Sequence, residues 1–161
     1  MLTALLGFMR RSAECARRRR YMIEIIAGEK GKGKTKELLN RVNGSVTSAS
    51  GNIVYLDKSG KHMYELNNKV RLINVTDYLI DSCDEFLGFI SGIISQDHDL
   101  EQMYLDSFLT IANVDTDEEI CHAIQKLDVI SEKYNVKFIL SVSRDESLLP
   151  ECAKAKIVVS L

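Results

Sequence analysis

The residues with the clearest chemical purpose form a glycine-rich loop near the start of the chain. Residues 28–35 read Gly-Glu-Lys-Gly-Lys-Gly-Lys-Thr and match the pattern G-x-x-x-x-G-K-[ST] at every fixed position. Glycines let the backbone turn tightly, so that successive N–H groups point into one hollow. The helix expected from Lys34 adds the positive end of its dipole. We therefore predict that this loop binds the phosphates of a nucleotide.

Two side chains of the loop have specific expected roles. We expect the Lys34 ammonium to contact the β- and γ-phosphates and to act in catalysis, and the Thr35 hydroxyl to bind Mg²⁺. Lys30 and Lys32 raise the local positive potential, although simple solvation accounts for at least one of them. The predicted nucleotide-binding residues are Gly28, Glu29, Lys30, Gly31, Lys32, Gly33, Lys34 and Thr35.

ATP is the predicted nucleotide, because two other classes fit less well. A dinucleotide site uses G-x-G-x-x-G, whereas Lys36 stands here in place of the third glycine. Nucleotide-switch G proteins read guanine with N-K-x-D, and the chain contains no such sequence, since residues 68–71 lack the aspartate.

Two aspartates end apolar runs and are candidates for the chemistry beside the phosphates. Nucleoside triphosphatases hold Mg²⁺ with an aspartate at the end of an apolar strand, and Asp106 fits that role. Many additional-strand ATPases place a glutamate directly after it to activate water, but this chain has Ser107. Asp57 competes for the Mg²⁺ role and is the residue we expect to orient the attacking water. Without a dedicated base, turnover should be slow.

Arg144 is a third catalytic candidate, because it follows the apolar run 137–142. A cationic side chain at such a position can act as a sensor of the γ-phosphate. A solvated surface arginine is the competing interpretation, and the sequence leaves both open.

These residues need strands and helices to hold them. Near-continuous apolar runs predict strands, and apolar residues at helical spacing predict helices. Strands are expected at residues 21–27, 52–57, 70–75, 103–109, 137–142 and 156–161, with a hairpin arm at 62–66. Helices are expected from residue 34, over 82–96, after the capping pair Thr116 and Glu119, and as a short turn at 146–149. The alternation predicts an α/β fold, with a mostly parallel sheet and helices on both faces.

The helix expected over 82–96 also contains two glycines at a spacing of four residues. In a membrane, Gly88 and Gly92 would suggest helix pairing. Here we expect them to let the helix lie close to the sheet.

Charge divides the chain into two unequal parts. Residues 1–20 carry six arginines and one glutamate, whereas residues 21–161 carry 15 basic and 22 acidic residues. We predict that residues 1–20 are a basic N-terminal extension outside the fold; an organellar transit peptide or a contact with anionic lipid or nucleic acid are the alternatives. Residues 21–161 form the predicted domain, whose acidic character disfavours nucleic acid as a partner.

The remaining composition points to a reduced cytoplasmic protein without a membrane span. The four cysteines and three histidines are scattered and lack zinc spacing, so we expect free thiols and no structural metal or disulfide framework. No apolar run reaches the roughly 18 residues that a span needs.

The chain from Met22 onwards resembles a family of small bacterial single-domain P-loop ATP-binding proteins, often labelled twitching-motility ATPase-like. The segments that carry the resemblance include MIEIIAGEKGKGKTKELLNRVN, NIVYLDKSGKHMYEL and KYNVKFILSVSRDESLLPE. The resemblance implies a three-layer P-loop NTPase domain that binds ATP, similar also to recombinase-type and thymidine-kinase-type cores. It does not extend to motility, because pilus retraction ATPases have an additional N-terminal domain, nor to thymidine kinase, because the paired cysteines of its zinc-binding lasso are missing.

Three functions remain open at this point. The first is a slow Mg²⁺-dependent ATPase or ATP-dependent switch, acting with an unidentified protein partner or as a homo-oligomer. The second is a small-molecule kinase, although three arginines outside residues 1–20 are few for a lid that closes over phosphates. The third is a non-catalytic nucleotide-sensing module, which the serine after Asp106 favours.

Overall fold

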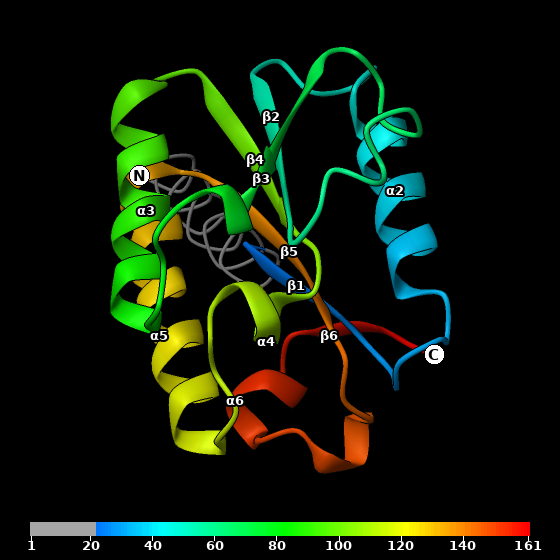
Figure 1. Cartoon of the computed structure of the whole chain (residues 1–161), viewed down its shortest axis with the longest axis vertical. Helices are drawn as coiled ribbons and strands as arrows, with labels where there is room; N and C mark the ends of the chain where they lie inside the picture. The colour runs from blue at the N-terminus through cyan, green and yellow to red at the C-terminus, as the bar shows by residue number, and fades with distance from the viewer. Residues whose placement is uncertain (1–21) are drawn as a thin grey trace, which may run out of the picture.

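A computed structural model describes residues 22–161, which form a sheet enclosed by helices (Figure 1). The strands are β1 (Ile23–Ala27), β2 (Asn52–Asp57), β3 (Val70–Asn74), β4 (Leu100–Leu105), β5 (Lys137–Val142) and β6 (Ile157–Ser160). The helices are α2 (Lys34–Ser45), α3 (Cys83–Gln96), α4 (Phe108–Ile111), α5 (Asp117–Tyr134) and α6 (Glu151–Lys154), with 3₁₀ turns η1 (Val75–Asp77) and η2 (Glu146–Leu148). The predicted α/β class is confirmed.

All strands of the described sheet are parallel, in the order β3-β2-β4-β5-β1-β6. Their carboxyl ends therefore meet at one edge, which is where open α/β sheets bind ligands. The segments that follow β1, β2, β4 and β5 converge there. They bring the glycine loop, Asp57, Asp106 and Ser143 to the same side of the molecule.

Helices cover both faces of the sheet (Figure 1). On one face, Leu38, Leu39 and Val42 of α2 are buried against strand residues that include Tyr55 and Tyr104. On the other face, α3, α4 and α5 contribute a larger buried cluster that includes Phe86, Ile90, Phe108, Ile124 and Leu127. Burying each such side chain contributes about 1.5–3 kcal/mol. This apolar contact fixes α2 against the sheet, and with it the loop that precedes α2.

The start of α5 follows the capping chemistry expected from the sequence, and the start of α3 has a similar cap. The Thr116 side chain accepts a hydrogen bond from the Glu119 N–H, and the Glu119 carboxylate accepts one from the Thr116 N–H. This is the predicted capping box, and it starts α5. At α3, Ser82 accepts a hydrogen bond from the Glu85 N–H.

Two strand predictions need correction. Residues 62–66 form turns rather than a hairpin arm. The strand predicted at 103–109 begins earlier, at Leu100, and ends at Leu105, because Ser107 adopts a left-handed conformation (φ 54°) and starts α4. The apolar residues after Asp106 belong to that short helix, so they extend the core and not the sheet.

The prediction for Gly88 and Gly92 is wrong. Both glycines are exposed, and a side-chain carbon at either position would meet no atom within 4 Å. The apolar face of α3 packs on the sheet side, while the glycines lie on the opposite face of the helix.

The expectation of free thiols is wrong for one cysteine pair. Cys121 of α5 and Cys152 of α6 form a disulfide, which joins positions 31 residues apart. Among residues 22–161, Cys83 is the free thiol. The packing of α6 against α5 brings the paired cysteines together, and their spacing in the sequence gives no sign of it.

No helix within residues 22–161 combines the length and the apolar character that crossing a bilayer requires. The predicted extension at residues 1–20 lies outside the described part of the chain, as does Tyr21 at the start of the first predicted strand.

Candidate functional site

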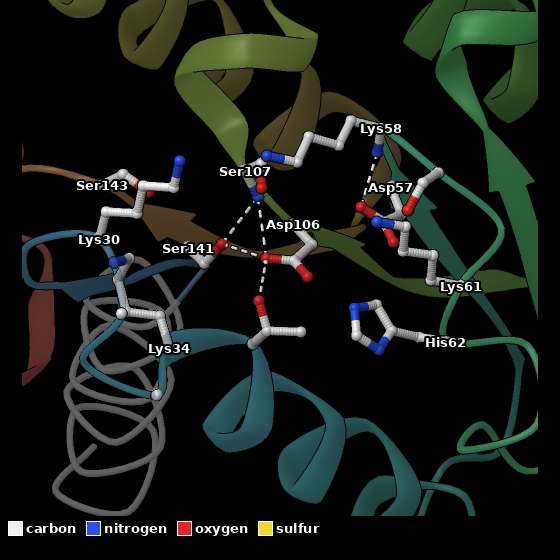
Figure 2. Close-up of a pocket in the computed structure, with 14 residues that line it drawn as sticks. Lys30, Lys34, Asp57, Lys58, Lys61, His62, Asp106, Ser107, Ser141 and Ser143 are labelled. Carbon is white, nitrogen blue, oxygen red and sulfur yellow. Dashed lines mark hydrogen bonds between the residues drawn. The ribbon is translucent and has the colours of Figure 1, made fainter.

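A cavity of about 590 Å³ opens at the carboxyl edge of the sheet. Figure 2 shows that its side chains come from the glycine loop, from the ends of β2, β4 and β5, and from the loop after β2. The polar residues that the sequence analysis placed on separate segments thus face a common space.

The glycine loop leaves the amino end of α2 free to meet an anion. Gly31 (φ 87°) and Gly33 (φ 91°) adopt conformations that favour glycine, and Gly33 occupies the N-cap position. Gly33 has no side chain to cap the helix, so the first N–H groups of α2 keep their donors available. These free donors and the helix dipole favour a negatively charged ligand.

Lys34 lies folded into this loop. Its side chain is buried, and Nζ donates a hydrogen bond of 2.6 Å to the backbone oxygen of Glu29. Burial lowers the pKa of Lys34, and the negative charge of Asp106 acts in the opposite direction. A buried ammonium satisfied by one carbonyl can exchange that contact for a stronger one with an anion, because charge-assisted hydrogen bonds are the stronger class.

The other predicted loop residues have different positions. Lys30, Gly31 and Gly33 line the cavity, whereas Lys32 is exposed outside it. The N–H of Gly28 donates to the backbone oxygen of Arg144, and a side chain on Gly28 would lie 2.7 Å from the backbone oxygen of Leu161. Close packing against the end of the chain therefore requires a glycine at position 28, which does not line the cavity itself.

Asp106 is the most completely hydrogen-bonded carboxylate of the site. Its Oδ1 accepts hydrogen bonds from Thr35 Oγ1 (3.2 Å), the Ser107 N–H (2.9 Å) and Ser141 Oγ (2.5 Å), and its Oδ2 accepts one from the Tyr55 hydroxyl (3.0 Å). The side chain is only 2% exposed. The structure thus brings together Thr35 and Asp106, the two residues predicted to bind Mg²⁺, although 71 positions separate them.

Tyr55 and Ser141 belong to this arrangement and were missed from the sequence. Burial and the Asp106 carboxylate raise the pKa of Tyr55, so its hydroxyl stays protonated and donates. Ser141 donates to Asp106 and accepts from the Ser107 N–H at 2.8 Å, which links β5 to β4. A polar residue inside the apolar run 137–142 was the signal that could have found Ser141.

Asp57 has far fewer partners than Asp106. It is 2% exposed, and its Oδ1 accepts a hydrogen bond of 2.7 Å from the Lys58 N–H. Its Oδ2 is buried and has no partner within residues 22–161. Burial, followed by the negative charge of Asp106, raises the pKa of Asp57. A buried oxygen without a donor is costly, so this carboxylate is ready to receive a proton, a water or a cation.

His62 is a third residue that sequence reasoning missed, after Tyr55 and Ser141. It lies in the loop after β2, and Figure 2 shows its ring across the cavity from Asp106. Asp57, His62 and Asp106 each present one potential ligand atom, and these three atoms lie within 4.8 Å of one another. His62 Nδ1 also lies 2.8 Å from Glu65 Oε1.

Arg144 is not brought to the cavity. Its guanidinium donates to Asp117 Oδ1 at 2.8 Å and to the backbone oxygen of Asp115 at 2.6 Å, at the start of α5. The neighbouring Ser143 lines the cavity instead. The structure therefore gives Arg144 a contact with the start of α5, and the sensor role predicted for it has no geometric support.

No protein-family model matches the chain, and no curated protein matches it in sequence. The site must therefore be interpreted from its own residues.

Proposed function

We propose that the protein binds ATP together with Mg²⁺ at the carboxyl edge of its sheet and hydrolyses it slowly, as an ATPase or an ATP-dependent switch. The observation that carries this proposal is the hydrogen bond from Thr35 to Asp106, with Lys34 beside it. It joins the end of β4 to a loop whose sequence matches a phosphate-binding pattern.

The donor set fits Mg²⁺, which prefers hard oxygen ligands and keeps several waters. Thr35 and Asp106 would hold the ion, which would neutralise charge on the phosphate oxygens. The topology adds support, since β5 lies between β1 and β4 and contributes Ser141, which donates a hydrogen bond to Asp106.

The chain's own residues divide the remaining tasks. Lys34 exchanges its contact with the Glu29 oxygen for phosphate oxygens. Asp57 orients the attacking water through its unpartnered oxygen, and its raised pKa suits it to accept a proton. Ser107 occupies the position after Asp106 without a carboxylate, which is why we expect slow turnover.

The direct test is calorimetry of Mg·ATP binding to the wild type and to Lys34→Ala. A charge-assisted contact is worth about 1.5–3 kcal/mol, so the variant should bind about ten- to a hundredfold more weakly. Lys32→Ala is the matched control, because Lys32 is exposed and does not line the cavity. Equal affinities of wild type and Lys34→Ala would overturn the proposal.

A small-molecule kinase is the second candidate, and one observation favours it. A further cavity of about 340 Å³, lined by residues that include Thr76, Tyr78 and Thr110, shares Lys58 with the main cavity. It could hold a phosphate acceptor. Phosphate release by the purified protein alone indicates an ATPase, and transfer to an added acceptor indicates a kinase. Binding without either reaction indicates a nucleotide-sensing module.

A further inference from the structure

Three side chains that could bind a metal ion lie together in the cavity, and none of them belongs to the glycine loop. Asp57, His62 and Asp106 converge from the end of β2, the loop after it and the end of β4 (Figure 2). They offer two carboxylates and one imidazole. Among the histidine, cysteine, aspartate and glutamate side chains of residues 22–161, these are the three that lie close enough together to share one ion.

Asp57 supplies an independent reason to expect a ligand at this point. Its Oδ2 is buried and unpartnered within the described residues, while Oδ1 is satisfied by the Lys58 N–H. A buried carboxylate oxygen normally has a donor or a cation. Since Asp57 lines the cavity, that missing partner would reach it from the cavity.

His62 has the surroundings of a metal ligand. Ligating histidines usually donate their second ring N–H to a carboxylate, which fixes the tautomer and the ring orientation. The Nδ1 of His62 lies 2.8 Å from Glu65 Oε1, so Glu65 can play this part. Nε2 then carries the lone pair that is free to bind an ion.

The chemistry of the donors selects the kind of ion. Mg²⁺ takes oxygen ligands and keeps its waters, whereas imidazole suits first-row transition metals. Lys30, Lys34, Lys58 and Lys61 also line the cavity, and their charge weakens purely electrostatic attraction for any cation. That repulsion acts equally on every divalent ion, so the imidazole of His62 is what favours a nitrogen-binding ion over Mg²⁺.

We propose that Asp57, Asp106 and His62 form a site for a divalent first-row transition-metal ion, held without nucleotide, with Glu65 orienting His62. The site shares Asp106 with the Mg²⁺ position, and its relevance to ATP chemistry rests on the proposed function. In this site Asp57 is a ligand of the ion, whereas in the Mg·ATP complex of the proposed function its second oxygen orients water.

The test is titration of the full-length, chelator-treated protein with Co²⁺ alone, followed by calorimetry and by visible absorption. We expect one Co²⁺ per chain, retained in excess Mg²⁺. His62→Ala should weaken Co²⁺ binding by at least about tenfold, and Glu65→Gln by about 10–100-fold, the usual cost of losing an orienting partner. His98→Ala is the matched control, because exposed His98 precedes β4 at the opposite edge of the sheet and should leave binding unchanged.

Equal Co²⁺ affinity of the wild type and His62→Ala, or no binding by the wild type, would overturn the site. His62 lies in a turn and not in the core, so we expect His62→Ala to fold. If His62→Ala does not fold, the Co²⁺ affinity of Glu65→Gln tests the site instead. Lys34→Ala separates this inference from the proposed function. It should bind Co²⁺ as the wild type does and ATP about ten- to a hundredfold more weakly, so either binding activity can fail while the other stands.

Discussion

The two aspartates of the cavity differ sharply in their surroundings. Asp106 accepts hydrogen bonds from four donors, which lie on β2, on β5, at the start of α2 and at the start of α4. Asp57 accepts one from its own neighbour and keeps a buried oxygen without a partner in the described part of the chain. Both are 2% exposed, so burial alone does not explain the difference. The Asp106 side is organised in advance, while the Asp57 side is incomplete until something binds.

Preorganised groups and incomplete groups have different uses. A fixed carboxylate can hold an ion at low cost, because its orientation does not change on binding. A carboxylate with an unmet oxygen can exchange protons or recruit a ligand. The contrast supports Asp106 as the holding group and Asp57 as the reacting or recruiting group, and variants can test each half separately.

The largest expected effect is on the Asp57 side. Asp57→Asn should lower single-turnover ATP hydrolysis by about 10²–10⁴-fold, the usual contribution of one general base, because the amide cannot accept a proton from water. Mg·ATP affinity should change little, since the loop and Asp106 remain. Hydrolysis at the wild-type rate would mean that Asp57 has no role in the reaction. The protein would then be better interpreted as a nucleotide-binding module, or as one part of a site that a partner completes.

The next effect is on the Asp106 side. Asp106→Asn presents an amide N–H₂ to hydroxyl and N–H donors, so hydrogen bonds to a charged acceptor are lost. Each is worth about 1.5–3 kcal/mol, and we expect at least about 3 kcal/mol of lost unfolding free energy. Urea denaturation measures this loss, and calorimetry with and without Mg²⁺ should show weaker magnesium-dependent ATP binding. If Asp106→Asn were as stable as the wild type, the hydrogen bonds of Asp106 would not stabilise the fold, and this difference from Asp57 would not hold.

Ser141→Ala examines one contact of Asp106 by itself. The variant removes a donor to Asp106 and an acceptor for the Ser107 N–H, which should cost about 1.5–3 kcal/mol in urea denaturation. Ser143→Ala is the control, because Ser143 also lines the cavity but is exposed. Equal losses in both variants would show that Ser141 adds nothing specific to the Asp106 side.

Most of the fold could be predicted because local patterns decide it. The run from Ile23 to Ala27 is apolar at four of its five positions and is buried at every one, as expected for a central parallel strand. Its charged member, Glu24, pairs with Lys137 at 2.6 Å. Asp57 and Asp106 could be found because each ends such a run. Their opposite environments could not, since these depend on Tyr55, Ser141 and other donors that only the assembled sheet brings close.

Long-range packing explains what the sequence could not predict about these residues. His62 lies in a turn segment without periodicity, so its approach to the two aspartates depends on how that turn folds back. Arg144 was predicted by its place after β5, but acceptors at the start of α5 hold its guanidinium. The disulfide between Cys121 and Cys152 likewise depends on the contact between two helices.

The smallest expected effect concerns the stability of the metal-free protein. The pKa of Asp57 is raised in the folded state by burial and by Asp106. Below the ordinary pKa of aspartate, both folded and unfolded chains hold this proton, and Asp57 costs nothing. As pH rises, the unfolded chain ionises first, so stability falls until the folded carboxyl has also ionised. Asp57→Asn does not ionise and avoids this loss.

With a chelator present, Asp57→Asn should therefore be as stable as the wild type near pH 3–4 and more stable near pH 8, by thermal denaturation across that range. Asp106→Asn should remain less stable than the wild type near pH 8, because it loses hydrogen bonds that the ionised carboxylate accepts. Lower stability of Asp57→Asn near pH 8 would mean that the Asp57 carboxylate makes a stabilising contact, and the asymmetry of the two aspartates would be lost.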